Sequence, residues 1–70
     1  MQESPRFGHL AQTFAGRQLP LVVLRSAAGY YLGTWDDEGP FTRESQEYFS
    51  NEQAAQDALA RGDWTQRQSL

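Results

Sequence analysis

Residues 19–35, LPLVVLRSAAGYYLGTW, decide the fold of this chain. The apolar and partly β-branched part at residues 19–25 is too short for a typical helix, which predicts a strand. Residues 30–35 are rich in aromatic side chains, and this composition favours a second strand. The intervening SAAG predicts a turn, in which Gly29 can adopt a positive φ angle. The stretch therefore predicts a β-hairpin.

An acidic turn and a third strand are predicted to follow the hairpin. Residues 36–40, DDEGP, combine acidic side chains with Gly and Pro, a composition typical of an exposed turn. A third, interrupted strand is predicted within residues 41–49, most clearly at residues 47–49, EYF. Residues 19–49 would then form a three-stranded antiparallel β-meander.

The sequence predicts a helix over residues 50–62. Ser50 and Gln53 have the spacing of a capping box, in which each side chain bonds a free N–H group at the helix start. Gly62 is a typical residue for a left-handed helix end. A narrow stripe of small apolar residues would pack on the sheet: Ala54, Ala55, Ala58 and Leu59. Residues 63–70 form a polar tail that we expect to fray.

Residues 1–18 are predicted to be either a short helix or an unstructured arm. Ser4 and Pro5 suit the start of a helix, and Gly16 suits its end. Apolar side chains also recur at helical spacing: Phe7, Leu10, Ala11 and Phe14. Gly8 opposes the helix, because a glycine inside a helix costs about 1 kcal/mol. The predicted class is α+β: the β-meander packed against a C-terminal helix, with an optional N-terminal helix.

Length and composition indicate one small domain spanning residues 1–70. The chain has no cysteine, so neither a disulfide nor a thiolate metal site can stabilise it. It contains no apolar run long enough to cross a bilayer. Its first residues, MQESP, lack the basic and apolar regions of a signal peptide. We therefore expect a cytoplasmic location and no membrane partner.

The charge of the chain is concentrated in its second half. The net charge is −3, and residues 36–70 carry eight acidic residues against three arginines. A duplex-binding protein normally shows a basic face, because contacts with phosphates supply most of its affinity. An acidic surface favours instead a protein partner with a basic surface, although it can also serve solubility alone. The candidate partner-binding residues are Asp36, Asp37, Glu38, Glu44 and Glu47.

Patterns that would indicate catalysis or a metal site are lacking in the sequence. His9 is the one histidine, so a zinc site built on His and Cys is excluded within a single chain. Residues 36–39, DDEG, lack the spaced acidic ligands of a calcium-binding EF-hand loop. The glycines are scattered and form no phosphate-binding loop. We therefore expect a non-enzymatic protein with no metal and no cofactor.

An aromatic and arginine surface is the alternative site. Alternation along a strand sends Tyr31 and Trp35 to one face of the sheet. If that face is uncovered, these rings beside Arg25 and Arg43 could stack on single-stranded nucleic acid. They could equally anchor a protein partner, form the core of the domain, or be covered by a second copy in a homodimer.

Several segments of the chain together resemble a group of small accessory proteins from proteobacterial plasmids, phages and genomic islands. The resemblance covers residues 20–67 and is carried by residues 30–34 (YYLGT), 39–45 (GPFTRES), 47–49 (EYF) and 62–67 (GDWTQR). It implies a mobile-element context, in which small acidic proteins inhibit host defence nucleoprotein complexes; anti-CRISPR proteins are examples. A plasmid-maintenance role is the alternative in the same context. The resemblance assigns no site residue.

Overall fold

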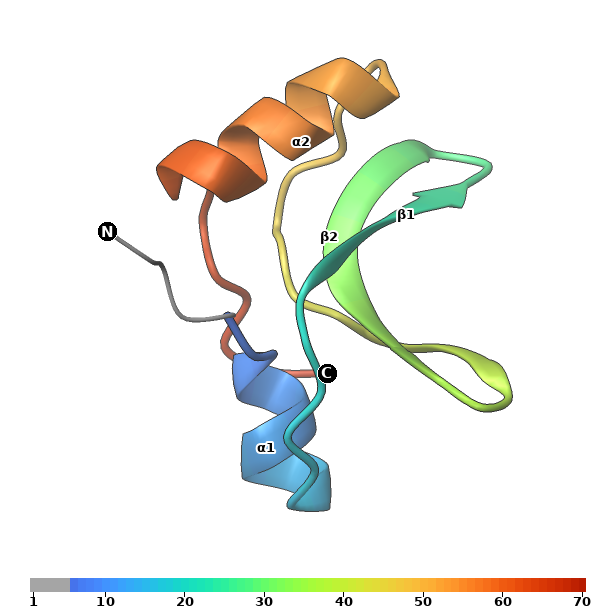
Figure 1. Cartoon of the computed structure of the whole chain (residues 1–70), viewed down its shortest axis with the longest axis vertical. Coiled ribbons are helices and arrows are strands. Elements are labelled where there is room, and N and C mark those ends of the chain that lie inside the picture. The colour runs from blue at the N-terminus through green and yellow to red at the C-terminus, as the bar shows by residue number, and fades with distance from the viewer. Residues whose placement is uncertain (1–5) are drawn as a thin grey trace.

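The structure is a computed structural model that describes residues 6–70, and it confirms the predicted α+β class (Figure 1). Along the chain the elements are α1 (His9–Ala15), β1 (Val22–Ser26), β2 (Gly29–Asp36), β3 (Gly39–Arg43) and α2 (Glu52–Arg61). Within the described residues, no helix has the length and apolar character needed to cross a membrane.

The three strands form one antiparallel sheet in the order β1-β2-β3. Both connections are tight turns, and the glycine after each turn has a positive φ angle, 132° at Gly29 and 122° at Gly39. The predicted hairpin of the first two strands is therefore confirmed. The third strand lies earlier than predicted, because the turn occupies only residues 37–38 and Gly39 already pairs with Asp36 of β2. Pro40 is tolerated there since β3 is an edge strand.

Residues 47–49, predicted as the clearest part of the third strand, belong to no strand in the structure. Phe49 forms an isolated bridge with Tyr30, and each backbone N–H donates to the carbonyl oxygen of the other residue. This bridge holds the segment before α2 beside the first residues of β2.

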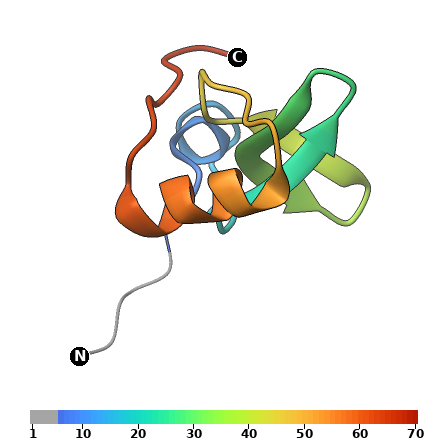
Figure 2. The same ribbon diagram turned by 90° about the horizontal axis from the view of Figure 1, so that it is seen from above.

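Both helices lie on the same side of the sheet (Figures 1 and 2). α1 contacts β3, whereas α2 contacts β1 and β2. The hydrophobic core between the helices and the sheet contains the buried residues Leu10, Ala11, Leu32, Ala55 and Ala58. The opposite face of the sheet has no helix over it in the described part of the chain, and this uncovered face defines the site considered below.

The N-terminal helix begins later than its apolar spacing predicts. Leu10 and Ala11 are fully buried, as the predicted apolar stripe implies, but Phe14 is 55% exposed, so the stripe is wrong at this position. Phe7 precedes the helix and forms a bridge with Pro20. Gly16 ends the helix in the left-handed conformation, as predicted. The predicted start at Ser4 and Pro5 lies outside the described residues.

The second helix differs from the prediction at its start, and the tail differs in how it is held. Asn51, rather than Ser50, caps α2, because its side-chain oxygen accepts a 2.8 Å hydrogen bond from the N–H of Ala54. Gly62 ends the helix as predicted. Residues 65–67 of the tail are held by backbone hydrogen bonds to the segment after β3, so the prediction that the tail frays is wrong for these residues.

Candidate functional site

Glu44 is fully buried, so its predicted place on an acidic surface is wrong. Its carboxylate lies at the start of α1 and accepts hydrogen bonds from backbone and side-chain donors. The donors are Leu10 N (2.9 Å), Ala11 N (3.2 Å), Thr42 Oγ1 (2.6 Å) and Gln66 Nε2 (2.7 Å). Glu44 thus connects α1, β3 and the C-terminal tail.

The charge state of Glu44 is determined by two opposing effects. Burial raises the pKa of the carboxyl group, because a buried charge loses hydration. The hydrogen bonds from Leu10, Thr42, Gln66 and Ala11 favour the charged form and outweigh burial, so the pKa is lowered overall. Glu44 is therefore an ionised structural residue.

Glu47 is half-buried and also binds the tail. Its two carboxylate oxygens accept hydrogen bonds from the N–H of Thr65 at 2.9 and 3.0 Å. Burial acts to raise the pKa of Glu47, but the hydrogen bonds from Thr65 lower it overall. Its carboxylate therefore already has a partner within the chain.

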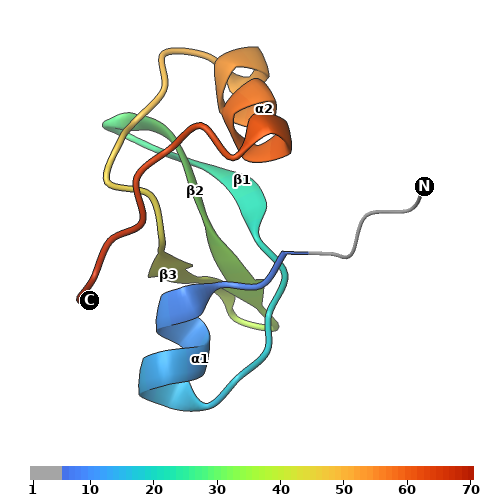
Figure 3. The same cartoon turned by 90° about the vertical axis from the view of Figure 1, so that its left-hand side faces the viewer.

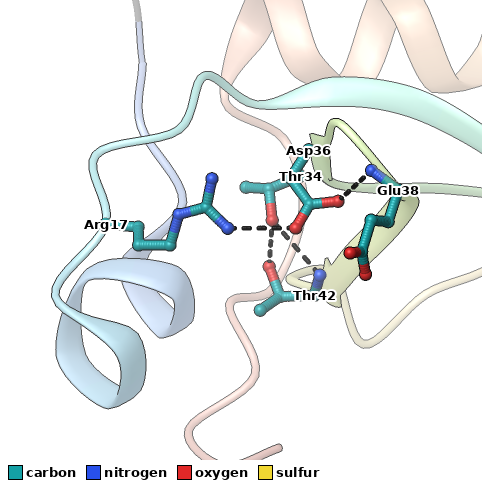
Figure 4. Close-up of polar contacts among 5 residues, drawn as sticks. All are labelled: Arg17, Thr34, Asp36, Glu38 and Thr42. Carbon is teal, nitrogen blue, oxygen red and sulfur yellow. Dashed lines mark hydrogen bonds and ion pairs between the residues drawn. The ribbon is translucent and has the colours of Figure 1, made fainter.

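The remaining three predicted acidic residues lie together at the turn between β2 and β3. Asp36 forms an ion pair with Arg17 at 3.0 Å and accepts a 2.9 Å hydrogen bond from the N–H of Glu38 (Figure 4). These hydrogen bonds, that of Glu38 first, lower the pKa of Asp36. Asp37 and Glu38 are exposed. We call Asp36, Asp37 and Glu38 the acidic turn.

Arg17 fixes the acidic turn to the end of α1. Its guanidinium group lies 5.0 Å from the centre of the Phe41 ring, in addition to its ion pair with Asp36. In the strands that precede and follow the turn, the Thr34 and Thr42 hydroxyl groups are 2.6 Å apart across β2 and β3 (Figure 4). The turn is therefore anchored through Asp36, whereas Asp37 and Glu38 are exposed.

The uncovered face of the sheet carries aromatic and apolar side chains. Strand register places on it Val22, Leu24, Tyr31, Gly33, Trp35 and Arg43, and we call these residues the open face. Trp35 is 54% exposed, next to the acidic turn. Tyr31 is buried, because its ring packs beside Gly33 and meets the Tyr48 ring edge-on, with centroids 5.9 Å apart. Burial raises the pKa of the Tyr31 hydroxyl, and nearby Tyr48 adds to this effect.

The structure brings together three of the four residues in the alternative aromatic and arginine site. Tyr31, Trp35 and Arg43 share the open face, whereas Arg25 pairs with Tyr30 on the opposite side, 5.6 Å from its ring centre. Tyr48 was not predicted as a site residue, because strand alternation cannot place a side chain that lies in no strand. Its ring lies 4.7 Å from the Arg43 guanidinium, and its hydroxyl accepts a hydrogen bond from that group.

Within residues 6–70, no three His, Cys, Asp or Glu side chains lie close enough together to hold a metal ion. Comparison with known proteins found no match to a protein-family model, a curated protein or a solved structure. The open face and the acidic turn are therefore the features of the molecule that bear on its function.

Proposed function

We propose that this chain is a non-enzymatic protein-binding module whose partner contacts Trp35 and the acidic turn. The observation that carries the proposal is the position of a tryptophan, 54% exposed on the sheet face that neither helix covers, beside two exposed carboxylates. Tryptophan is enriched among the residues that contribute most to protein–protein affinity. Carboxylates at the rim of such a contact chiefly accelerate association and select the partner.

The charge of this region favours a partner with a basic surface. Asp37 and Glu38 are exposed. One Asp36 carboxylate oxygen takes part in the ion pair with Arg17, and the other accepts a hydrogen bond from the N–H of Glu38. The resemblance of residues 20–67 to mobile-element accessory proteins supports a narrower form of the proposal. In that form the partner is a host defence nucleoprotein complex, and the carboxylates occupy a surface that otherwise binds nucleic acid.

The proposal can be tested by capture from a nuclease-treated proteobacterial lysate, followed by affinity measurement with the purified partner. We expect Trp35→Ala to weaken binding at least about tenfold, since truncation of a central anchor residue costs about 2 kcal/mol or more. We expect the double variant Asp37→Lys/Glu38→Lys to slow association and to reverse the salt dependence of binding.

Two matched variants distinguish this surface from the rest of the molecule. Phe14→Ala removes an aromatic ring of nearly equal exposure, 55%, from α1. Asp57→Lys/Asp63→Lys makes the same charge change at exposed positions on α2 and just after it. Both should bind like the unmodified chain. Unchanged binding by Trp35→Ala, or equal losses in the matched variants, would contradict the proposal.

A second candidate function is binding of single-stranded nucleic acid. The observation that favours it is the Arg43 guanidinium stacked on Tyr48, beside the face that carries Trp35. Such a surface can combine base stacking with phosphate contacts. It predicts binding of a labelled oligonucleotide that weakens as salt increases. An absence of binding at low salt would exclude this candidate. A dimer in sedimentation that Trp35→Ala disrupts would instead favour a second copy that covers the open face.

A further inference from the structure

A pocket of about 430 Å³ lies between the end of β3 and the C-terminal segment. Figure 3 shows that segment running beside the loop that follows β3, where Gln46 N–H donates a 2.8 Å hydrogen bond to the Thr65 carbonyl. The residues that line the pocket are Arg43, Gln46, Arg67, Gln68 and Ser69. Every one of these side chains can donate a hydrogen bond, and none is acidic.

The Arg43 guanidinium is held in place but retains donors. One of its terminal nitrogens donates to the Tyr48 hydroxyl, and the group stacks on the Tyr48 ring. Its Nε is buried, and it has no hydrogen-bond acceptor within residues 6–70. Because an arginine stays charged at any physiological pH, this group presents a fixed positive charge at the pocket wall.

Arg67 is positioned by its backbone rather than by its side chain. Its N–H donates a 2.7 Å hydrogen bond to the carbonyl oxygen of Glu44, and this bond fixes the position of the Arg67 backbone at the pocket. In the described part of the chain the ion pair found is that of Arg17 with Asp36, which involves neither pocket arginine. The pocket therefore concentrates two positive charges on a protein whose net charge is −3.

We infer that this pocket binds a phosphate group, with Arg43 and Arg67 as the two ligating cations. Planar guanidinium groups bind the oxygens of phosphates and carboxylates through paired hydrogen bonds, and the amide and hydroxyl side chains of the lining supply further donors. A dianionic phosphate matches the charge of two arginines better than a carboxylate does. The inference goes beyond the proposed protein contact, because it uses neither Trp35 nor the acidic turn.

The test is a titration of the isotope-labelled full chain with inorganic phosphate at neutral pH and constant ionic strength. Binding is monitored through the NMR signals of the backbone amides. We expect saturable shifts at Arg43, Gln46 and residues 67–69. Arg67→Gln should weaken binding at least about tenfold, because it removes a charge-assisted hydrogen bond to the ligand. Arg67→Lys should recover part of the affinity, since it restores the charge but not the paired hydrogen-bond donors of the guanidinium group.

Arg25→Gln is the matched control, because Arg25 is exposed at the far end of the first hairpin and should leave phosphate binding unchanged. Arg67→Gln retains the backbone hydrogen bond, and its thermal unfolding verifies that it is folded. Equal shifts with sodium chloride, or equal affinity in Arg67→Gln and the unmodified chain, would overturn the inference. Tighter binding of acetate than of phosphate would also overturn it and would assign the pocket to carboxylates.

Discussion

Glu44 is a buried charge that is stabilised by hydrogen bonds rather than by a cation. The ion pair present in the described residues, between Arg17 and Asp36, lies elsewhere. The carboxylate is stable because backbone N–H groups of α1 and side-chain donors of β3 and the tail surround it. Removal of the carboxylate would leave the buried N–H groups of Leu10 and Ala11 without this acceptor.

Glu44→Gln should therefore destabilise the protein markedly. The substituted amide keeps one accepting oxygen but turns an NH₂ group toward donors that need an acceptor. We expect a loss of about 2–3 kcal/mol in the free energy of unfolding, measured by urea or thermal unfolding. Glu38→Gln makes the same change on the exposed turn and should alter stability by less than about 0.5 kcal/mol. Equal effects of the two variants would contradict the structural role of Glu44.

The lowered pKa of Glu44 also predicts how stability depends on pH. Because the folded-state pKa lies below the ordinary value of 4.5, the unfolded chain binds more protons between these two values. The contribution of Glu44 is fully present above pH 4.5 and is lost as the pH falls through its folded-state pKa. Urea unfolding at decreasing pH should show this loss. In Glu44→Gln, the free energy of unfolding should depend less steeply on pH. An identical slope in both proteins would contradict the assignment; Asp36 and Glu47, also with lowered pKa values, titrate in both.

At the scale of the elements, Gly33 determines how closely β2 and β3 approach. A Cβ atom at this position would lie 2.2 Å from the carbonyl oxygen of Thr42 and 3.0 Å from the Tyr31 ring. Gly33→Ala should therefore separate the strands and cost about 1–3 kcal/mol or more in unfolding experiments. Gly16→Ala meets no atom within 4 Å and should cost only about 1 kcal/mol, from its left-handed backbone. A larger loss at Gly16 than at Gly33 would contradict this account.

The elements that depend on local chemistry could be predicted from the sequence. Glycine turns, the first hairpin and both helix ends at glycine follow from residues adjacent in the chain. The start of α1 could not be predicted, because its first N–H groups bond a carboxylate 34 residues away. β3 overlaps the start of the predicted range 41–49, but the clearest part of the strand was misplaced at 47–49, because the aromatic residues there favour a strand. Of the candidate site, the shared face of Tyr31 and Trp35 was predictable from strand alternation, whereas the burial of Glu44 was not.

At the scale of the whole molecule, the C-terminal tail holds the two ends of the fold together. The Gln66 side chain donates to the Glu44 carboxylate at 2.7 Å and to the Glu44 carbonyl oxygen at 3.2 Å. Gln66→Ala should cost about 1–2 kcal/mol and should increase hydrogen exchange at the N–H groups of Gln46 and Arg67. Gln68→Ala loses one longer, exposed hydrogen bond and is the matched control. Unchanged exchange in Gln66→Ala would show that the tail is held by its backbone alone.

The bonds of Glu44 also have a consequence for the time at which the chain can fold during its synthesis. α1 has seven residues, too few for an isolated helix to be stable in water. Its buried carboxylate partner is added 34 residues after Leu10, and the amide that completes the cluster comes 22 residues later still. Of the two helices, α1 therefore leaves the ribosome before α2 but is fully stabilised only after the tail has been added. The hairpin of β1 and β2, whose contacts are local, can form before α1 is stabilised by these hydrogen bonds.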